Sequence, residues 1–223
     1  MMTEAFDSII FDIDGTLWDS TAEVAESWSA TCERAGIPAG RITRERLLSE
    51  FGKVIEDIAY SLFPDLPPEK AVELAVRCGK EENSWLLAHR PPLYPGVSEL
   101  FRTLKERGFR IFIISNCTEG YIDTLTEIGD LRQYIEGQLC PADTGLAKAG
   151  NIKKGVREWQ CAAPVYVGDT MGDYLAAKEA GVPFIFASYG FGSVPEAEIS
   201  IAAPLDLLSL PVIQKGPRNM IKK

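Results

Sequence analysis

The sequence of 223 residues lacks features that mark whole classes of proteins. It has no long uninterrupted apolar run and no basic-then-apolar layout at its N-terminus, which predicts a cytoplasmic protein without a membrane partner. Its five cysteines are far apart and form no C-x-x-C pair, so we expect buried or idle thiols. Its single histidine, His89, lies beside a proline-rich stretch and is interpreted as a surface or hinge residue and not as a catalyst.

Positive charge is also scarce. The 23 Lys and Arg residues face 32 Asp and Glu residues, which leaves a net charge of −9. Nucleic-acid backbones are bound by basic stripes, so this balance argues against nucleic acid as the main partner. An acidic protein that handles a phosphorylated small molecule must reverse the local sign with a bound cation and a placed lysine. The charge therefore directs the search to a metal site.

The chain divides near residues 20 and 90. Residues 8–13 are apolar and predict a strand that ends at the Asp-Gly turn signal of residues 14–15. Residues 20–88 read as helical, with no strand evident, and the proline-rich stretch 90–96 is typical of a stiff connector between domains. The predicted division is a discontinuous catalytic core, 1–19 and 91–223, around a small all-helical cap domain, 20–90.

Two local expectations concern helix and chain ends. The helix that starts after Pro67 and Pro68 is expected to break near Gly79, because glycine weakens a helix interior. Residues 214–223 are polar and basic, and we expect them to form a frayed tail.

After residue 97 short apolar segments alternate with helical ones. This alternation predicts an α/β fold with a parallel sheet of at least five strands, including the first one. The later strands are expected at 110–114, 134–139, 164–167 and 183–187, and the helices at 97–107, 118–128, 152–159 and 172–180. Ligands of such sheets lie outside the carboxyl ends of the strands, so polar residues that directly follow strands carry most weight.

The first polar cluster is Asp12 and Asp14, which end the first predicted strand. One carboxylate can attack phosphorus and form an aspartyl-phosphate, while the other reaches the leaving group as general acid and then base. A divalent ion fits between them, and carboxylate ligands beside a substrate phosphate suit Mg²⁺. The alternative interpretation of this pair is a strand-ending turn.

Three further clusters follow separate strands. Ser115 and Asn116 can donate hydrogen bonds to phosphoryl oxygens, and Lys148, in a small-residue loop, can neutralise a carboxylate and the phosphoryl oxygens. Asp169 and Asp173 lie in a loop and in the first turn of a helix, where they can also serve as capping residues. Taken together, the clusters supply acids, donors and one cation at the same edge of the sheet.

These residues resemble the motifs of the haloacid dehalogenase superfamily, which consists mostly of phosphatases. Its four motifs correspond to residues 11–17, to residues 114–116, to Lys148, and to Gly168-Asp169 with Asp173. The resemblance spans residues 6–187 and implies a Rossmann-like core with a helical cap inserted after the first motif, as in the phosphoglycolate phosphatase-like branch.

The resemblance also implies roles for the site residues. Asp12 would be the nucleophile and a Mg²⁺ ligand, and Asp14 the acid/base that also binds the metal through its carbonyl group. Asp169 would be a further ligand, and Asp173 a ligand directly or through water. Ser115, Asn116 and Lys148 would hold the phosphoryl group, with backbone N–H groups near Gly15 and Thr16. The third motif departs from the common Lys-Pro form, since Ala149 follows Lys148.

Hydrolysis of a small phosphorylated metabolite is the function that these observations favour. A phosphomutase uses the same core and stays open, whereas the acids at positions 14 and 169 disfavour a dehalogenase and a non-catalytic phosphate-binding protein. The cap carries nine basic and twelve acidic residues, a net charge of −3, and so advertises no polyanion pocket. The substrate, the oligomeric state and the roles of Trp18 and Cys117 are not specified by the sequence.

Overall fold

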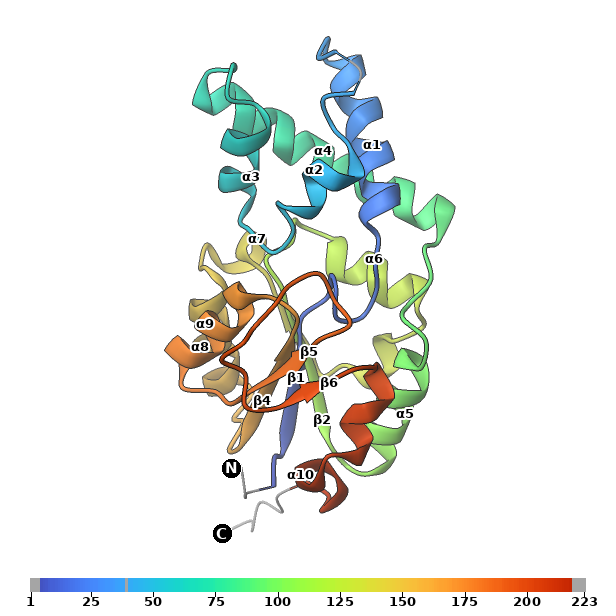
Figure 1. Cartoon of the computed structure of the whole chain (residues 1–223), viewed down its shortest axis with the longest axis vertical. Coiled ribbons are helices and arrows are strands. Elements are labelled where there is room, and N and C mark those ends of the chain that lie inside the picture. The colour runs from blue at the N-terminus through green and yellow to red at the C-terminus, as the bar shows by residue number, and fades with distance from the viewer. Residues whose placement is uncertain (1–4, 39, 218–223) are drawn as a thin grey trace.

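A six-stranded parallel sheet forms the centre of the computed structural model, which describes residues 5–38 and 40–217 (Figure 1). The strand order is β3-β2-β1-β4-β5-β6. The strands are β1 (Ser8–Phe11), β2 (Arg110–Ile114), β3 (Gly137–Leu139), β4 (Pro164–Gly168), β5 (Phe184–Ala187) and β6 (Ser200–Ile201). The α/β fold class and the parallel sheet are confirmed. The edge strand β6, only two residues long, is too short to give a sequence pattern.

β1 lies in the middle of the sheet and is buried along its whole length. Ile10 pairs with Phe112 of β2 on one side and with Tyr166 of β4 on the other. Ile9 and Phe11 point into one hydrophobic cluster and Ile10 into a second, because successive side chains of a strand face opposite ways. Both faces are therefore covered, as parallel sheets require.

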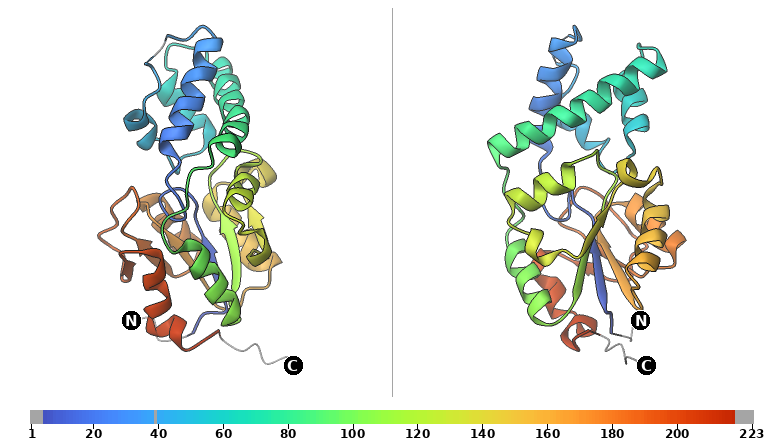
Figure 2. Two further views of the ribbon diagram at one scale, coloured as in Figure 1. Left: turned by 90° about the vertical axis from the view of Figure 1, so that its right-hand side faces the viewer. Right: turned by 180° about the vertical axis from the view of Figure 1, so that it is seen from behind.

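Helices cover the two faces of the sheet, and Figures 1 and 2 show α8 and α9 on one side and α5 with the C-terminal segment on the other. The helices of the core are α5 (Val97–Glu106), α6 (Tyr121–Ile128), α7 (Pro141–Thr144), α8 (Lys148–Glu158), α9 (Met171–Ala180) and α10 (Pro211–Gln214), with 3₁₀ turns η1 (Arg132–Tyr134) and η2 (Pro204–Ser209). β1 lies in the middle of the sheet, and the strand order reverses between β1 and β4. The carboxyl end of β1 therefore lies at the crevice formed by this reversal.

Four helices gather beyond the carboxyl ends of the strands (Figures 1 and 2). They are α1 (Thr21–Arg34), α2 (Arg44–Leu48), α3 (Ile55–Leu62) and α4 (Pro68–His89), and we call them the cap helices. α1 and α3 both pack on α4. This segregation of helices from the sheet supports the predicted division at residues 20 and 90, which we keep as a proposal.

The expected break at Gly79 is wrong, because α4 continues through it for 22 residues. Gly79 is buried, and a Cβ atom added there would come within 2.5 Å of Thr118 Cγ2. The glycine therefore allows the cap helix to approach the loop after β2 closely. This packing offsets the roughly 1 kcal/mol that glycine costs in a helix interior.

Two other helix boundaries differ from the expectation. α8 begins at Lys148, whereas the sequence predicted its start at Ile152, so Lys148 is the first helical residue and does not lie in a loop. α10 ends at Gln214, and residues 218–223 of the predicted frayed tail lie outside the described residues. Within the part of the chain that is described, no helix is both long enough and apolar enough to cross a membrane.

Asp7, just before β1, joins the start of that strand to the loop that leads into β4. Its buried carboxylate accepts hydrogen bonds from the backbone N–H groups of Ala162 at 2.8 Å and Ala163 at 3.0 Å. We expect Asp7→Ala to lower the free energy of unfolding by about 1–3 kcal/mol, because both donors lose their acceptor. Asp57→Ala, at an exposed position of α3, is the control and is expected to cost less than about 0.5 kcal/mol. Urea denaturation measures both, and equal effects would contradict this account.

Candidate active site

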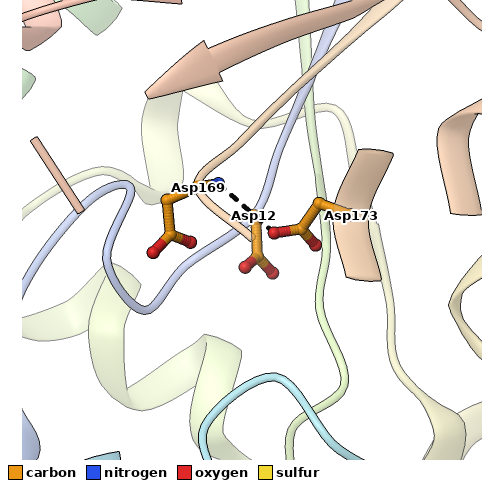
Figure 3. Close-up of side chains that lie close together, drawn as sticks. All are labelled: Asp12, Asp169 and Asp173. Atoms are coloured by element: carbon orange, nitrogen blue, oxygen red, sulfur yellow. Dashed lines mark hydrogen bonds between the residues drawn. The ribbon is translucent and has the colours of Figure 1, made fainter. Parts of the chain in front are cut away.

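Three carboxylates meet at the carboxyl ends of β1 and β4. Asp12 directly follows β1, Asp169 directly follows β4, and Asp173 lies in the first turn of α9 (Figure 3). One oxygen of each lies within 4.8 Å of the others. The three residues are 2%, 0% and 0% exposed, so their charges face a medium that screens poorly. The sequence predicted this convergence from separate strands.

Lys148 supplies the positive charge of the cluster. Its Nζ lies 2.9 Å from Asp12 Oδ1 and 2.5 Å from Asp173 Oδ1, and the residue is only 4% exposed. Burial lowers the pKa of the ammonium group, but the two carboxylates outweigh burial and hold this pKa well above its usual value. The first position of α8 thus places a permanent cation between two acids. The neighbouring Lys153 and Lys154 instead form ion pairs on the surface.

Ser115 completes the contacts of Asp12. It follows β2, is buried, and hydrogen-bonds through its hydroxyl group to the Asp12 carboxylate. Burial and the nearby Asp173 charge raise the pKa of Asp12 to about 6, against the opposing effect of Lys148 and Ser115. The predicted set Asp12, Ser115, Lys148 and Asp173 is therefore one hydrogen-bonded group.

Asp169 has one satisfied and one unsatisfied oxygen. Its Oδ2 accepts a hydrogen bond from the backbone N–H of Phe191 at 2.7 Å, whereas its buried Oδ1 has no hydrogen-bond partner. Burial, together with the charges of Asp173 and Asp12, raises the pKa of Asp169 to about 8. A buried carboxylate oxygen needs a partner, such as a cation or a donor group of a ligand. A cation at this oxygen would remove the repulsion among the three acids.

This donor set fits a divalent metal ion. All three candidate ligands are carboxylates, which suit Mg²⁺, and Mg²⁺ commonly uses few protein ligands and keeps waters for the rest. The orphaned Oδ1 of Asp169 and the three converging acids are the observations that support the fit. Asp12, Asp169 and Asp173 could therefore hold the ion, and the predicted fourth ligand, the carbonyl group of Asp14, stays a prediction.

Asp173 also caps α9, which was the alternative interpretation of this residue. Its Oδ2 accepts hydrogen bonds from Thr170 N at 3.0 Å and Thr170 Oγ1 at 2.6 Å, in a capping box. Oδ1 remains for Lys148. Asp173 thus caps α9 through one oxygen and pairs with Lys148 through the other, and its role as a metal ligand stays a prediction.

Asp14 lies beside this cluster and faces the cap helices. Its Oδ1 accepts hydrogen bonds from Tyr121 Oη at 2.7 Å, Trp18 Nε1 at 3.0 Å and Ser20 Oγ at 3.3 Å. Burial raises the pKa of Asp14 to about 7, and these hydrogen bonds only partly oppose that shift. Such a carboxyl group can carry a proton near neutral pH. Trp18, whose role the sequence left open, is fully buried and orients Asp14.

The turn after Asp14 is held by its own backbone. Gly15 has a φ of +76°, which favours glycine, and its N–H donates to Trp18 O at 2.9 Å. The N–H of Thr16 donates to Ile13 O at 3.0 Å. Both N–H groups are thus engaged inside the turn, and their predicted part in phosphate binding would require them to exchange these partners.

Asn116 connects the core to the segment between α2 and α3. Its Nδ2 donates to Gly52 O at 2.9 Å, so the side chain contacts the segment between α2 and α3. Phe51 packs edge-on against Phe191, with ring centroids 5.9 Å apart. Figure 1 shows this cap segment descending towards the core. The structure therefore places Asn116 at the junction of the two units, beside Ser115 but with other partners.

Sequence reasoning missed Tyr121 and the loop that holds Asp169. Tyr121 begins α6 after Gly120, and no motif links it to Asp14, 107 residues earlier. In the loop after β5, a Cβ atom on Gly190 or Gly192 would overlap Asp169. The two glycines that flank Phe191 were the available signal, because glycines permit close backbone approach. At Cys117, the neighbouring Cys140 thiol and burial raise the pKa well above its usual value.

Comparison with known proteins agrees with this geometry. The family described as "Haloacid dehalogenase-like hydrolase" matches residues 9–187, and the chain belongs to this family. "Phosphoglycolate phosphatase" of Agrobacterium fabrum (strain C58) is 28% identical over 205 residues, which cover 88% of this chain and 87% of that protein. "Phosphoglycolate phosphatase" of Aquifex aeolicus is 26% identical over 214 residues, which cover 91% and 95%.

Solved structures share the fold. A putative haloacid dehalogenase-like hydrolase from Bacteroides fragilis superposes with a TM-score of 0.80 at 21% identity, covering 91% of this chain and 99% of that one. A predicted phosphoglycolate phosphatase from Haemophilus somnus superposes with a TM-score of 0.78 at 20% identity, covering 94% and 99%. At these identities the likeness defines the fold.

Metal binding is testable without an activity assay. At a tenfold excess over its dissociation constant, Mg²⁺ should stabilise the protein by about 1.4 kcal/mol, or roughly 3–6 °C in Tm. We expect Asp169→Asn to lose this shift, while its Tm without Mg²⁺ stays equal or rises because one repelling acid is gone. Asp143→Asn, at an exposed position of α7, is the control and should keep the shift. An unchanged shift in Asp169→Asn, measured by differential scanning fluorimetry, would contradict a metal at these carboxylates.

Proposed function

We propose that this chain is a Mg²⁺-dependent phosphatase that hydrolyses a small organic phosphate monoester through an aspartyl-phosphate on Asp12. The observation that carries the proposal is the buried contact of Lys148 with both Asp12 and Asp173, beside the unsatisfied oxygen of Asp169. This contact supports Asp12 as the nucleophile, Lys148 as a fixed cation and Asp169 as a metal ligand. Family membership and relatives named phosphoglycolate phosphatase support a phosphatase over a phosphomutase.

In the first step an Asp12 carboxylate oxygen attacks phosphorus, and the bond from phosphorus to the ester oxygen breaks. Asp14 gives its proton to that leaving oxygen, so that the product departs as a neutral alcohol. Its Oδ2, which accepts no hydrogen bond from the described residues, is the oxygen suited to carry this proton. Tyr121, Trp18 and Ser20 fix the carboxyl group through the other oxygen.

In the second step water attacks the phosphorus of the aspartyl-phosphate, and Asp14 takes a proton from the water. The bond between phosphorus and Asp12 breaks, which regenerates the carboxylate and releases inorganic phosphate. The same residue thus serves first as acid and then as base. Its pKa of about 7 suits both duties near neutral pH.

Lys148 and Ser115 act on charge and position. Both contact Asp12 and can also reach phosphoryl oxygens, so they orient the nucleophile and offset negative charge in the transition state. When bound by Asp12, Asp169 and Asp173, Mg²⁺ would supply further neutralisation of the phosphoryl oxygens. Cytoplasmic location is part of the proposal, and the five free cysteines are consistent with a reducing compartment.

Asp12→Asn should abolish turnover, because an amide side chain cannot form the aspartyl-phosphate. We expect phosphate release to fall at least about a thousandfold, as when other covalent nucleophiles are removed. Asp7→Asn is a matched control, since Asp7 is a second buried aspartate, at the opposite end of β1. Retention of a tenth or more of the activity in Asp12→Asn would overturn Asp12 as nucleophile.

Replacement of Asp14 should discriminate between leaving groups. An alkoxide needs a proton to depart, whereas p-nitrophenolate does not, so Asp14→Asn should lose about a hundredfold on alkyl phosphates. On p-nitrophenyl phosphate we expect a loss of no more than about tenfold. The ratio of the two kcat/KM values measures the effect. An equal loss on both substrates would mean that Asp14 is not the general acid.

A further inference from the structure

A cavity between the cap helices and the core opens directly beside Asp14. The empty space among its lining residues is about 510 Å³ and includes open solvent. Core residues Asp14, Asn116 and Tyr121 line one side, and cap residues Trp28, Phe51 and Glu82 line the other. Since Asp14 is the proposed acid for the leaving oxygen, this cavity is where the leaving group of the substrate would lie.

Aromatic and aliphatic side chains form much of the cavity wall. Trp28 is buried between α1 and α4, and Phe51 and Ile58 come from the segment after α2 and from α3. A ligand group that enters such a cavity loses water contacts. For a negatively charged group this desolvation is strongly unfavourable unless a cation pairs with it.

The positive charge in the cavity wall already forms an ion pair with an acidic side chain of the same wall. Among the described lining residues Lys53 is the one basic side chain, and its Nζ lies 2.8 Å from Glu50 Oε2. Although burial raises the pKa of Glu50, hydrogen bonds from Lys53 and Ser61 outweigh burial and lower it. Glu50 is therefore ionised and cancels the charge of Lys53.

Glu82, from α4, is the opposite case, a buried acid without a cation. The residue is 5% exposed, and its carboxylate accepts hydrogen bonds from Trp28 Nε1 and from Thr118 Oγ1, the latter at 3.2 Å. Burial and the charge of Asp14 raise the pKa of Glu82 to about 8, and among the described residues no basic side chain opposes this shift. Two neutral donors fix its orientation, and within the described part of the chain no basic side chain forms an ion pair with it, so Glu82 is ionised at neutral pH only when a ligand brings a positive charge or a strong donor to it.

The polar atoms of the cavity wall that are left for a ligand are mostly hydrogen-bond acceptors. Asn116 Oδ1 is buried and has no donor, while Asn116 Nδ2 is used by Gly52. The hydroxyl group of Tyr121 donates to Asp14, and that of Thr118 donates to Glu82. A ligand that satisfies Asn116 and Glu82 must bring hydrogen-bond donors of its own.

We propose that the leaving group carries a hydrogen-bond donor, a hydroxyl or ammonium group, and no carboxylate or second phosphate, and that Glu82 is the specificity-determining residue that recognises this donor. The inference rests on the proposed function and names its substrate class. It sets this chain apart from the relatives named phosphoglycolate phosphatase, since the carboxylate of phosphoglycolate would meet Glu82 and a neutralised Lys53.

Four phosphate monoesters of similar length test the proposal. They end in a carboxylate (2-phosphoglycolate), an ammonium group (phosphoethanolamine), a hydroxyl group (2-hydroxyethyl phosphate) and a methyl group (n-propyl phosphate). With Mg²⁺ present, we expect kcat/KM for the ammonium and hydroxyl esters to exceed that for 2-phosphoglycolate by at least about tenfold. A value for 2-phosphoglycolate equal to or above both would overturn the inference.

Two matched variants of buried acids assign the residue. In Glu82→Gln the ratio of kcat/KM for phosphoethanolamine to that for n-propyl phosphate should fall at least about tenfold. In Glu50→Gln, Lys53 is released, so kcat/KM for 2-phosphoglycolate should rise at least about threefold relative to n-propyl phosphate. A purely structural role for Glu82 would lower all four rates together and leave the ratio unmoved, which would overturn its assignment.

The outcome separates the two levels of the account. If wild type prefers 2-phosphoglycolate but Asp12→Asn is inactive, the phosphatase proposal stands and the inference about the cavity fails. If neither the four esters nor p-nitrophenyl phosphate release phosphate in the presence of Mg²⁺, both fail. A phosphatase that prefers the donor-bearing esters and loses this preference in Glu82→Gln supports both.

Discussion

The contact of Lys148 with Asp12 and Asp173 is the interaction on which the rest of the site depends. Three carboxylates converge in a buried space, where Asp173 raises the pKa of Asp12, and Asp173 and Asp12 together raise the pKa of Asp169. One buried ammonium group offsets only one of the three carboxylate charges, so two negative charges remain when all three acids are ionised. The proposed metal ion would offset the remaining charge, and a substrate phosphate could then enter a site whose protein is acidic overall.

Strands and helices, and not loops alone, hold these charged side chains in place. Asp12 and Asp169 follow adjacent parallel strands in register, and Lys148 and Asp173 occupy the first turns of two helices that pack on each other. The loop after β5 then closes over Asp169 through the N–H of Phe191. Elements far apart in sequence are therefore needed to hold each acid, and none can shift without disturbing a second contact.

Much of this could be predicted from the sequence. The strand and helix alternation predicted the parallel sheet, and the position of acids directly after strands predicted Asp12 and Asp169. The predictions that failed or were missing concern a helix interior, a helix start and contacts between residues far apart in the sequence. Gly79 weakens a helix by propensity, but its close packing on Thr118 decides otherwise. Tyr121 and Glu82 leave no local pattern, because their roles depend on the contact between cap and core. The first position of α8 was masked by the small residues that follow Lys148.

The central claim is that the phosphoryl group is transferred to Asp12 before water hydrolyses the aspartyl-phosphate. The most direct measurement is the stereochemical course at phosphorus, with a substrate whose thiophosphoryl group is chiral by isotopic labelling and is hydrolysed in labelled water. Each in-line displacement inverts phosphorus, so transfer to Asp12 followed by hydrolysis predicts net retention of configuration. Net inversion would mean that water attacks the substrate directly, and it would contradict an aspartyl-phosphate on Asp12.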